Sequence, residues 1–391
     1  MREGWEYKKL GEVCTIERGG SPRPIADFVT ESSDGINWIK IGDAIEGSKY
    51  ILSTKEKIKP EGIKKSRYVH KGDFILSNSM SFGKLYILGI DGCIHDGWLV
   101  LHDKNNTFSK DYLYYVLSSP IMYSKFTQLA VGGVVNNLNS NLVRDVIVAI
   151  PTISTQRSIA SELDMITEMI SKYDEQLKEL DKLSQSIFYE MFGDPVENEK
   201  GWEVKKLEEI CDKITDGTHL SPKNDPVGDY MYVTAKNIKK DGVIFDNITY
   251  IDKETHKCIY SRCNPEYGDV LYIKDGVTTG VATINTVYEE FSLLSSVALL
   301  KTSNSIINYY LKYILNMPTM YNNIRSNMGG VAITRLTLVK IKKLLIPLPP
   351  LPLQQSFARK IEAIEAMKSK VREAKKEAET LLAARMQYWF E

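Results

Sequence analysis

The sequence lacks the groups of residues that define metal sites and disulfide frameworks. Its 391 residues include five cysteines and five histidines. The number of cysteines is odd, and no Cys-x-x-Cys pair occurs. His256 is near Cys258 and Cys263, but not at the ligand spacing of a structural zinc site. We therefore expect reduced thiols, a cytoplasmic location and no bound metal.

Long hydrophobic runs and an excess of one charge are also missing. No apolar segment approaches the length of a membrane span, and the first residues do not have the pattern of a signal peptide. The 50 basic and 50 acidic residues cancel, which on its own argues against a nucleic-acid-binding protein. However, residues 151–199 hold 4 Lys or Arg against 11 Asp or Glu, so the other segments are slightly basic. The charge distribution therefore permits DNA binding without demonstrating it.

A long helix is the strongest signal that is present. Between Ser154 and Phe192, apolar residues recur in alternating steps of four and three, and no proline interrupts them. Ser154 is the expected N-cap, and Gly193 followed by Pro195 is the expected stop. At about 1.5 Å per residue the helix is about 60 Å long, which is too long for the core of one compact domain.

A second apolar stripe with the same spacing runs along residues 351–391. A single stripe of this kind most often marks an ordinary surface helix, but two sustained stripes favour a helix pair. Because the chain must return after a whole domain, we predict an antiparallel coiled coil. The predicted seam consists of Ile159, Leu163, Ile166, Ile170, Tyr173, Leu177, Leu180 and Ile187 on the first helix and Phe357, Ile361, Ile364, Met367, Val371 and Leu381 on the second.

An internal repeat organises the whole chain. Residues 4–10 (Gly-Trp-Glu-Tyr-Lys-Lys-Leu) return as 201–207 (Gly-Trp-Glu-Val-Lys-Lys-Leu), and Gln156-x-Ser158-x-Ala160 returns as Gln-x-Ser-x-Ala at 354–358. So long a period excludes a solenoid and indicates duplication of a domain followed by a helix. The predicted segments are a globular domain at 1–150, a long helix at 151–194, a second globular domain at 195–350 and a second long helix at 351–391.

Each globular segment combines predicted strands with a short helix. Short apolar or alternating runs bounded by Gly, Asn and Asp predict strands at 35–41, 73–77, 84–88, 270–273 and 296–300. The stretches 110–117 and 307–315 are predicted helices that end before a proline. The fold class is therefore mixed α/β, with two globular domains that are each followed by a long helix.

In this layout and in its motifs the chain resembles the specificity (S) subunit of type I restriction-modification systems. The resemblance covers essentially the whole chain. It rests on the Gly-Trp-Glu-x-Lys-Lys-Leu openings, the Pro and Gln-x-Ser-x-Ala helix entries, and Met191-Phe192-Gly193-Asp194-Pro195 at the end of the first helix. Members usually have Glu before the helix-entry Gln, whereas this sequence has Thr155 and Leu353.

The resemblance implies a function and partners. Residues 1–150 and 195–350 are then target-recognition domains 1 and 2, each reading one half of a bipartite site in double-stranded DNA. The helices hold the domains apart and dock DNA adenine methyltransferase (modification) subunits, two by this family's pattern. Whether restriction (motor and nuclease) subunits also bind stays open. The resemblance implies no catalysis in this chain, no cofactor and no membrane.

Polar loops at equivalent places in the repeat are the predicted DNA contacts, because base edges and phosphates are read by Arg, Lys, Asn, Gln, Ser, Thr and His. A solvated turn is the alternative for each loop. In domain 1 the candidates are Arg18, Ser21, Arg23, Ser77, Asn78, Ser81, Lys84, Asn136 and Asn137. In domain 2 they are Thr218, His219, Lys223, Lys274, Thr278, Thr279, Thr334 and Arg335.

The sequence contains no complete catalytic motif that would favour an enzyme over a DNA-recognition subunit. Residues 264–267 (Asn-Pro-Glu-Tyr) lack the second proline of the adenine-methyltransferase loop, and no glycine-rich cofactor loop accompanies them. Glu6-x-Lys8 and its repeat fit a nuclease motif, yet their identical placement indicates a structural strand. The alternative from another class is a coiled-coil scaffold whose globular domains bind protein partners. A self-contained methyltransferase or nuclease ranks third.

Overall fold

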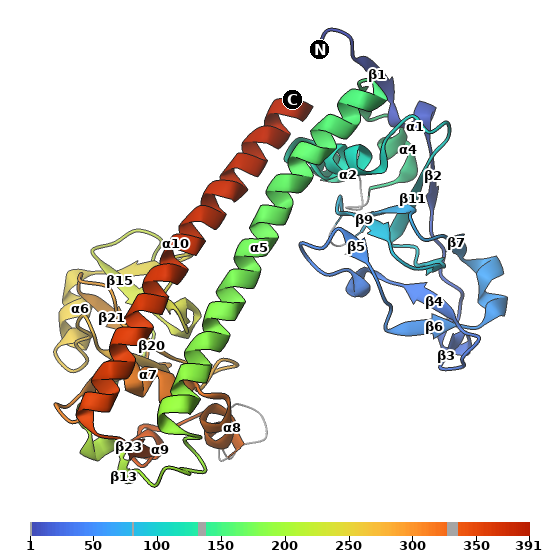
Figure 1. Cartoon of the computed structure of the whole chain (residues 1–391). Coiled ribbons are helices and arrows are strands. Elements are labelled where there is room, and N and C mark those ends of the chain that lie inside the picture. The colour runs from blue at the N-terminus through green and yellow to red at the C-terminus, as the bar shows by residue number, and fades with distance from the viewer. Residues whose placement is uncertain (1, 80–81, 132–137, 327–334) are drawn as a thin grey trace. The chain divides into compact units, whose positions relative to one another are not determined.

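The computed structural model describes residues 2–79, 82–131, 138–326 and 335–391, which divide into two compact units (Figure 1). Unit 1 comprises residues 1–174 and 373–391, and unit 2 comprises residues 175–372. Each unit therefore contains one globular segment and one part of each long helix. Among the described residues, no helix is long and apolar enough to cross a membrane.

Unit 1 is built on two sheets of mixed short strands. Its main sheet has the order β2-β11-β8-β9-β5 and a second sheet the order β3-β6-β4-β10-β7, while β1 pairs with β12. The elements are β1 (Glu6–Lys9), α1 (Leu10–Val13), β2 (Cys14–Arg18), β3 (Val29–Thr30), β4 (Ile36–Ile39), β5 (Tyr50–Ile51), β6 (Glu56–Ile58), β7 (Arg67–Val69), β8 (Phe74–Ser77), β9 (Leu85–Leu88), β10 (Gly92–Ile94), β11 (Trp98–Asp103), α2 (Lys110–Ser118), α3 (Pro120–Val131), α4 (Ser140–Arg144) and β12 (Ile147–Ile150).

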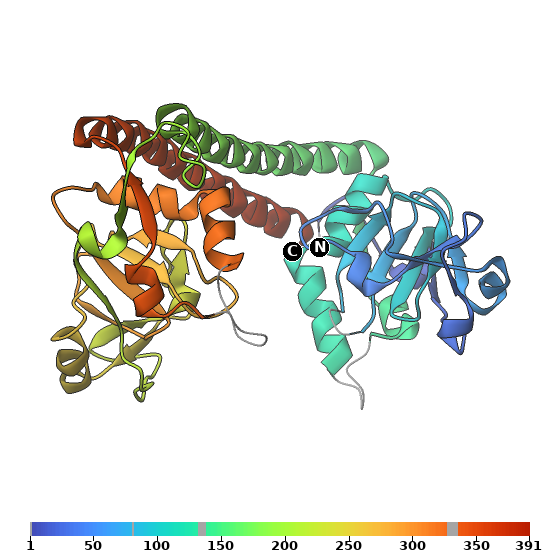
Figure 2. The ribbon, with the colours of Figure 1, turned by 90° about the horizontal axis from the view of Figure 1, so that it is seen from below.

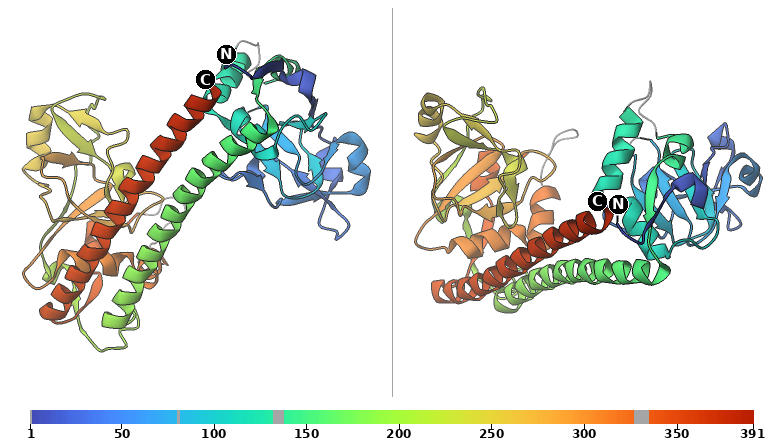
Figure 3. Two further views of the ribbon diagram at one scale, coloured as in Figure 1. Left: turned by 45° about the horizontal axis from the view of Figure 1, so that its top comes forward. Right: turned by 90° about the horizontal axis from the view of Figure 1, so that it is seen from above.

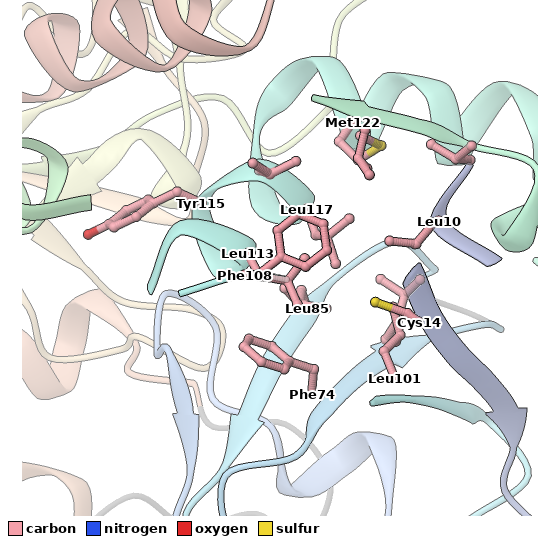
Figure 4. Close-up of a cluster of buried hydrophobic side chains, with 14 of the residues drawn as sticks. Leu10, Cys14, Phe74, Leu85, Leu101, Phe108, Leu113, Tyr115, Leu117 and Met122 are labelled. Atoms are coloured by element: carbon pink, nitrogen blue, oxygen red, sulfur yellow. The ribbon is translucent and has the colours of Figure 1, made fainter. Parts of the chain in front are cut away.

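The main sheet of unit 1 is buried on both faces. Alternate residues of a strand point to opposite sides. Phe74 and Leu101 therefore belong to the core beneath α2, where Figure 4 shows them with Leu113. Ile75 and Val100 face a second buried cluster on the other side. Burial on both faces explains why these strands are continuous apolar runs in the sequence.

Unit 2 repeats this plan. Its main sheet has the order β14-β22-β19-β20, accompanied by β18-β15-β21 and by the pairs β13-β23 and β16-β17. The elements are β13 (Glu203–Lys206), β14 (Cys211–Asp216), β15 (Tyr230–Val233), β16 (Ile238–Lys239), β17 (Gly242–Val243), β18 (Thr249–Ile251), α6 (Lys253–Tyr260), β19 (Val270–Ile273), β20 (Ala282–Ile284), β21 (Phe291–Leu293), β22 (Val297–Thr302), α7 (Asn308–Asn316), α8 (Pro318–Ser326), α9 (Leu338–Lys342) and β23 (Leu345–Leu348).

Helix α7 of unit 2 lies between its main sheet and the long helices (Figure 2). Tyr310 of α7 is fully buried, and its ring stacks on that of Phe188 with the centroids 5.8 Å apart. Its hydroxyl donates to the carbonyl of Pro347 at 2.6 Å. In unit 1, Tyr112 of α2 donates in the same way to Ala149 at 2.9 Å. The repeat in the sequence is therefore a repeat of buried contacts.

The long helices α5 (Ile153–Phe192) and α10 (Leu351–Phe390) run antiparallel in each unit, as predicted. In unit 1, Arg385 pairs with Glu162, and Lys375 lies 2.7 Å from Asp174. In unit 2, Lys368 lies 2.5 Å from Asp181, and the rings of Phe188 and Phe357 are 5.6 Å apart. Higher numbers on α10 face lower numbers on α5 in every pair, which defines the antiparallel direction.

Each long helix ends in the core of the unit that it does not begin in. Phe188 and Phe192, at the end of α5, belong to the core of unit 2. Met386 and Phe390, at the end of α10, pack in the core of unit 1. The N- and C-termini of the chain consequently lie side by side, where Arg2 stacks over aromatic rings of the last turn of α10 (Figure 3).

The structure contradicts three residue predictions for the long helices: the cap Ser154 and the seam residues Met367 and Leu381. Helix α5 begins at Ile153, before the predicted cap Ser154, and the Thr152 hydroxyl accepts from the Thr155 amide at 3.3 Å. The predicted seam residues Met367 and Leu381 are 46% and 48% exposed, while Lys368 is buried. An α-helix repeats every 3.6 residues, so its buried face drifts from a strict 3.5-residue seam. Gly193 has φ of 76° and ends α5 as predicted.

The other predicted seam residues differ in burial along the helices. Those in the first part of each helix are buried, and those farther along are partly exposed. The buried ones are Ile159, Leu163, Ile166, Phe357, Ile361 and Ile364. The partly exposed ones are Ile170, Tyr173, Leu177, Leu180, Ile187 and Val371.

Candidate nucleic-acid interface

The candidate loops of each unit begin at one edge of its main sheet. In unit 1, β2 and β8 both run antiparallel to β11, with Arg18 opposite Leu99 and Ser77 opposite Trp98. In unit 2, β14 and β19 flank β22 in the same manner, with Asp216 opposite Ala298. Strands antiparallel to a common neighbour are parallel to each other, so their carboxyl ends meet at one edge.

The third candidate segment joins the second at this edge in both units. The amide of Leu138 donates to the carbonyl of Asn78 at 2.9 Å, and the amide of Leu336 donates to the carbonyl of Lys274 at 2.8 Å. The two hydrogen bonds occupy equivalent positions of the repeat. The described parts of the three loops predicted from the sequence therefore meet in one cluster in each unit.

Asp96 organises the cluster of unit 1. The Ser21 hydroxyl donates to its carboxylate at 2.8 Å, and His95 Nε2 lies 3.0 Å from the same oxygen. Its backbone carbonyl accepts from Arg18 Nε at 2.9 Å and from Asn78 Nδ2 at 3.1 Å. Although burial raises the pKa of Asp96, the Ser21 hydrogen bond and the nearby cationic side chains outweigh it and lower the pKa. Asp96 therefore keeps its negative charge and ties the first loop to the second.

Asp216 organises the cluster of unit 2. This carboxylate is 1% exposed and lies 3.3 Å from Lys274 Nζ, 3.2 Å from Arg262 Nη1 and 3.4 Å from His219 Nε2. Lys274 is itself 2% exposed, and its ammonium also lies 3.2 Å from Asp275. Buried charges are stable only when they are paired, so this network fixes the loops that carry it.

A second carboxylate places the arginine of the third loop. Asp275 pairs with Arg335 Nε at 3.2 Å, and the two residues also form an isolated β-bridge. The Arg335 side chain is 56% exposed, so its guanidinium reaches solvent while one edge is held. Arg23 in unit 1 is looser, because its side chain is 82% exposed and lies 3.8 Å from Asp96.

A glycine is required where the first loop leaves each sheet. A Cβ on Gly217 would lie 1.9 Å from the carbonyl oxygen of Leu293, and one on Gly19 would lie 2.2 Å from that of His95. No side chain fits at these distances. The close approach brings the first loop against the neighbouring strand in both units.

The exposure of the predicted residues divides them into two groups. Arg18, Arg23, His219, Lys223, Thr278 and Arg335 are exposed, whereas Ser21, Lys84 and Thr218 are partly buried. Ser77, Asn78, Lys274 and Thr279 are at most 2% exposed. The prediction that these four side chains contact DNA is therefore corrected: they support the loops from inside. The predicted Ser81, Asn136, Asn137 and Thr334 lie outside the described residues.

The sequence reasoning missed the acidic residues of both clusters. Asp96, Asp216 and Asp275 were not selected, because only donors to DNA were sought. Arg262 was also missed, since it follows α6 and reaches Asp216 across 46 residues of sequence. The one local signal was position in the sequence, because Asp216 lies two residues before the candidate Thr218 and Asp275 directly follows the candidate Lys274.

The two motifs set aside as structural are structural in this fold. Glu6 and Lys8 lie on β1 and pair with each other at 2.6 Å, and Glu203 and Lys205 do so on β13 at 2.5 Å. Glu266 precedes β19 in a turn and pairs with Lys301 at 2.8 Å. Within the ranges the structure describes, no group of three or more His, Cys, Asp or Glu side chains is arranged to hold a metal ion.

Comparison with known proteins identifies a family whose domain occurs twice in this chain. The family model described as "Type I restriction modification DNA specificity domain" matches residues 2–181 and again residues 199–379. The chain therefore belongs to this family and contains two copies of its domain. The resemblance predicted from the sequence is confirmed.

Two relatives are similar to this chain over most of their lengths. The type I restriction enzyme MjaIX specificity subunit of Methanocaldococcus jannaschii is 23% identical over 375 residues, covering 90% of this chain and 85% of that one. The putative MjaX specificity subunit of the same organism is 23% identical over 412 residues, covering 97% and 93%.

The solved structures share the fold. One chain, from a study of complex assembly and conformational transition of the type I R-M system, has a TM-score of 0.60 at 20% identity and covers 100% of this chain and 98% of its own. The S subunit of a type I restriction-modification system from M. genitalium has a TM-score of 0.54 at 13% identity, with 99% and 96% coverage.

Proposed function

We propose that this chain is a non-catalytic DNA-recognition subunit in which units 1 and 2 each read one half of a bipartite site. One observation carries the proposal. Each unit gathers three loops at the same edge of its sheet, held by the same backbone hydrogen bond, yet the two clusters differ in their side chains. Two readers of different half-sites need this combination of shared position and different chemistry.

The exposed side chains of the clusters fit base reading. An arginine recognises guanine through two hydrogen bonds to O6 and N7, and each such pair discriminates by about 1–3 kcal/mol. Arg335 is held at one edge by Asp275 and has its other nitrogens free of the ion pair. This arrangement orients the guanidinium before DNA arrives. Arg23 and His219 are the corresponding exposed donors of the first loops.

The partners follow from the relatives, which are named specificity subunits of type I restriction enzymes. By analogy, DNA adenine methyltransferase (modification) subunits associate with this chain, and we propose two of them, one for each copy of the domain. In this assembly the methyl transfer belongs to the partner, and α5 and α10 provide the shared docking surface. A restriction subunit is a further partner of the same complex.

Selection from random duplex DNA, with the modification subunit present, tests the proposal. We expect a bipartite sequence with an unconserved spacer and an affinity that falls steeply with salt. The scaffold alternative predicts no selected sequence and no salt-dependent affinity. Lys257→Ala serves as a control for the arginine variants of the clusters, because Lys257 is exposed on α6 and is not a predicted DNA contact.

A further inference from the structure

Lys312 of α7 is a buried lysine without an acidic partner. Its side chain is 7% exposed and lines a cavity of about 180 Å³ in unit 2. Its ammonium lies 5.3 Å from the centre of the Tyr313 ring. The Lys312 ammonium forms no hydrogen bond or ion pair with any residue that the structure describes. An unpaired buried cation is costly to the fold and marks a place where an anion is missing.

The other charges around the cavity are already paired. Lys368 lies 2.5 Å from Asp181 and 3.2 Å from Glu365. The Tyr313 hydroxyl donates to Glu365 at 3.1 Å. At the turn between β16 and β17, Asp241 is 2.8 Å from Arg372, and the neighbouring Lys240 is exposed at the rim. Asp181 and Glu365 therefore share Lys368, Asp241 has Arg372, and none of these carboxylates pairs with the Lys312 ammonium.

Unit 1 shows what completes such a site. There the ammonium of Lys49 lies 5.4 Å from the ring of Tyr115, the repeat equivalent of Tyr313. It pairs with Asp111 at 2.6 Å and with Asp164 at 3.6 Å. The residue of α7 equivalent to Asp111 is Tyr309, which has no negative charge. The same ring thus faces an ammonium in both units, but only in unit 1 do carboxylates pair with that ammonium.

The titration of the two lysines follows this difference. Burial lowers the pKa of Lys49, but Asp111 and Asp164 outweigh it and raise the pKa overall. Burial also lowers the pKa of Lys312, and the more distant charges of Glu365 and Asp241 do not restore it. Lys368 and Arg372 lower it further.

We propose that the cavity of unit 2 beside Lys312 binds a carboxylate, which takes the place that Asp111 and Asp164 have beside Lys49. The cavity is far larger than the space of one water molecule, so a carboxylate group fits. The group comes from a free carboxylic acid or from an acidic side chain of a docked protein. This inference does not depend on DNA recognition.

Calorimetric titration of the purified full chain tests the first source. Acetate and succinate are the probes, with chloride at equal ionic strength as the control. We expect binding with uptake of a proton, because a carboxylate raises the lowered pKa of Lys312, so the heat depends on the ionisation heat of the buffer. Lys312→Met should weaken binding at least about tenfold, and Lys257→Met, at an exposed position of α6, should not.

The second source is tested by the affinity for the modification subunit. If neither small carboxylate binds, Lys312→Met should weaken this association by about tenfold or more. Lys257→Met, at an exposed position of α6, should have no effect. Lys312→Met should also raise the melting temperature of the chain, because it removes an unpaired buried charge. Unchanged carboxylate and partner affinities, or a fall in the melting temperature, overturn the proposal by assigning Lys312 to the fold alone.

Discussion

Units 1 and 2 place the same loops at the same sheet edge but hold them with differently buried charges. The carboxylate of Asp96 in unit 1 is 31% exposed and binds mainly neutral hydrogen-bond donors and His95. The carboxylate of Asp216 in unit 2 is 1% exposed and faces the buried ammonium of Lys274. The comparison separates two roles: the sheet determines where the loops are, and the local network determines how firmly they are held.

The largest expected effect comes from separating the two halves of the chain. A fragment of residues 1–194 contains the globular part of unit 1 and all of α5, but lacks the end of α10. Phe188 and Phe192 of α5 are the repeat equivalents of Met386 and Phe390, which fill the core of unit 1. Two fragments should therefore exchange these ends and form a two-fold dimer.

The dimer should change the DNA target completely. With the modification subunit supplied, binding selection should return an inverted repeat of the first half-site, because protein symmetry dictates site symmetry. Sedimentation measures the dimer, and Phe188→Asp is the control that should keep the fragment monomeric. A stable monomer, or a selected site that remains asymmetric, would show that the two ends are not equivalent.

The next effect distinguishes the two carboxylates. Asp216→Ala leaves buried Lys274 with only Asp275, and we expect a loss of about 3–5 kcal/mol in unfolding free energy. Asp96→Ala should cost about 1–2 kcal/mol, since a partly exposed carboxylate is involved. Denaturant unfolding measures both. Equal losses would contradict the distinction, and the double variant Asp216→Leu with Lys274→Met should recover part of the stability.

Substitution of Gly19 in unit 1 and substitution of Gly217 in unit 2 should destabilise the fold to a similar extent. Gly19→Ala and Gly217→Ala each force a Cβ into a backbone carbonyl, and we expect about 1–3 kcal/mol of destabilisation for either. Gly42→Ala is the control, because a Cβ there meets nothing within 4 Å. If only one of the two variants is destabilised, the shared entry of the first loop is disproved.

The smallest effect is a pH dependence in unit 1 alone. His102 pairs with Asp73 at 3.2 Å, and this hydrogen bond raises the His102 pKa. A raised folded pKa gives stability that is fully present below the ordinary histidine pKa of about 6.5 and is lost as pH rises through the folded value. In unit 2, Lys301 takes the histidine's place beside Asp269 at 2.7 Å, and lysine keeps its charge over this range.

Hydrogen exchange between mildly acidic and mildly alkaline pH should therefore detect weakening around β8 and β11 but not around β19 and β22. The effect should be below about 1 kcal/mol, because the His102 side chain is 39% exposed and solvent screens the pair. His102→Gln should abolish the difference. A matching pH dependence in unit 2 would contradict the assignment to His102.

The sequence predicted the features that depend on local pattern and on repetition. The strands at 74–77 and 270–273, the helices α2 and α7, the two long helices and their antiparallel pairing follow from periodicity and from the repeat. These predictions succeeded because the spacing of residues along the chain and the internal repeat determine them.

The failures depend on contacts between distant residues. Lys274 has the local signature of an exposed loop lysine, and only Asp216, 58 positions earlier in the sequence, explains its burial. Asn78 is buried in the same way, because its amide reaches the carbonyl of Asp96. Met367 and Leu381 were misplaced because a spacing error of one residue accumulates over several helical turns.

The most direct test of the central claim compares single-loop variants on both half-sites at one salt concentration. In the complex with the modification subunit, Arg335→Ala or His219→Ala should relax selection in one half-site, and Arg23→Ala should relax it in the other. Each should lose about 1–3 kcal/mol of discrimination at the affected bases. A variant that weakens both half-sites equally would contradict the account, because separate readers cannot share one loop.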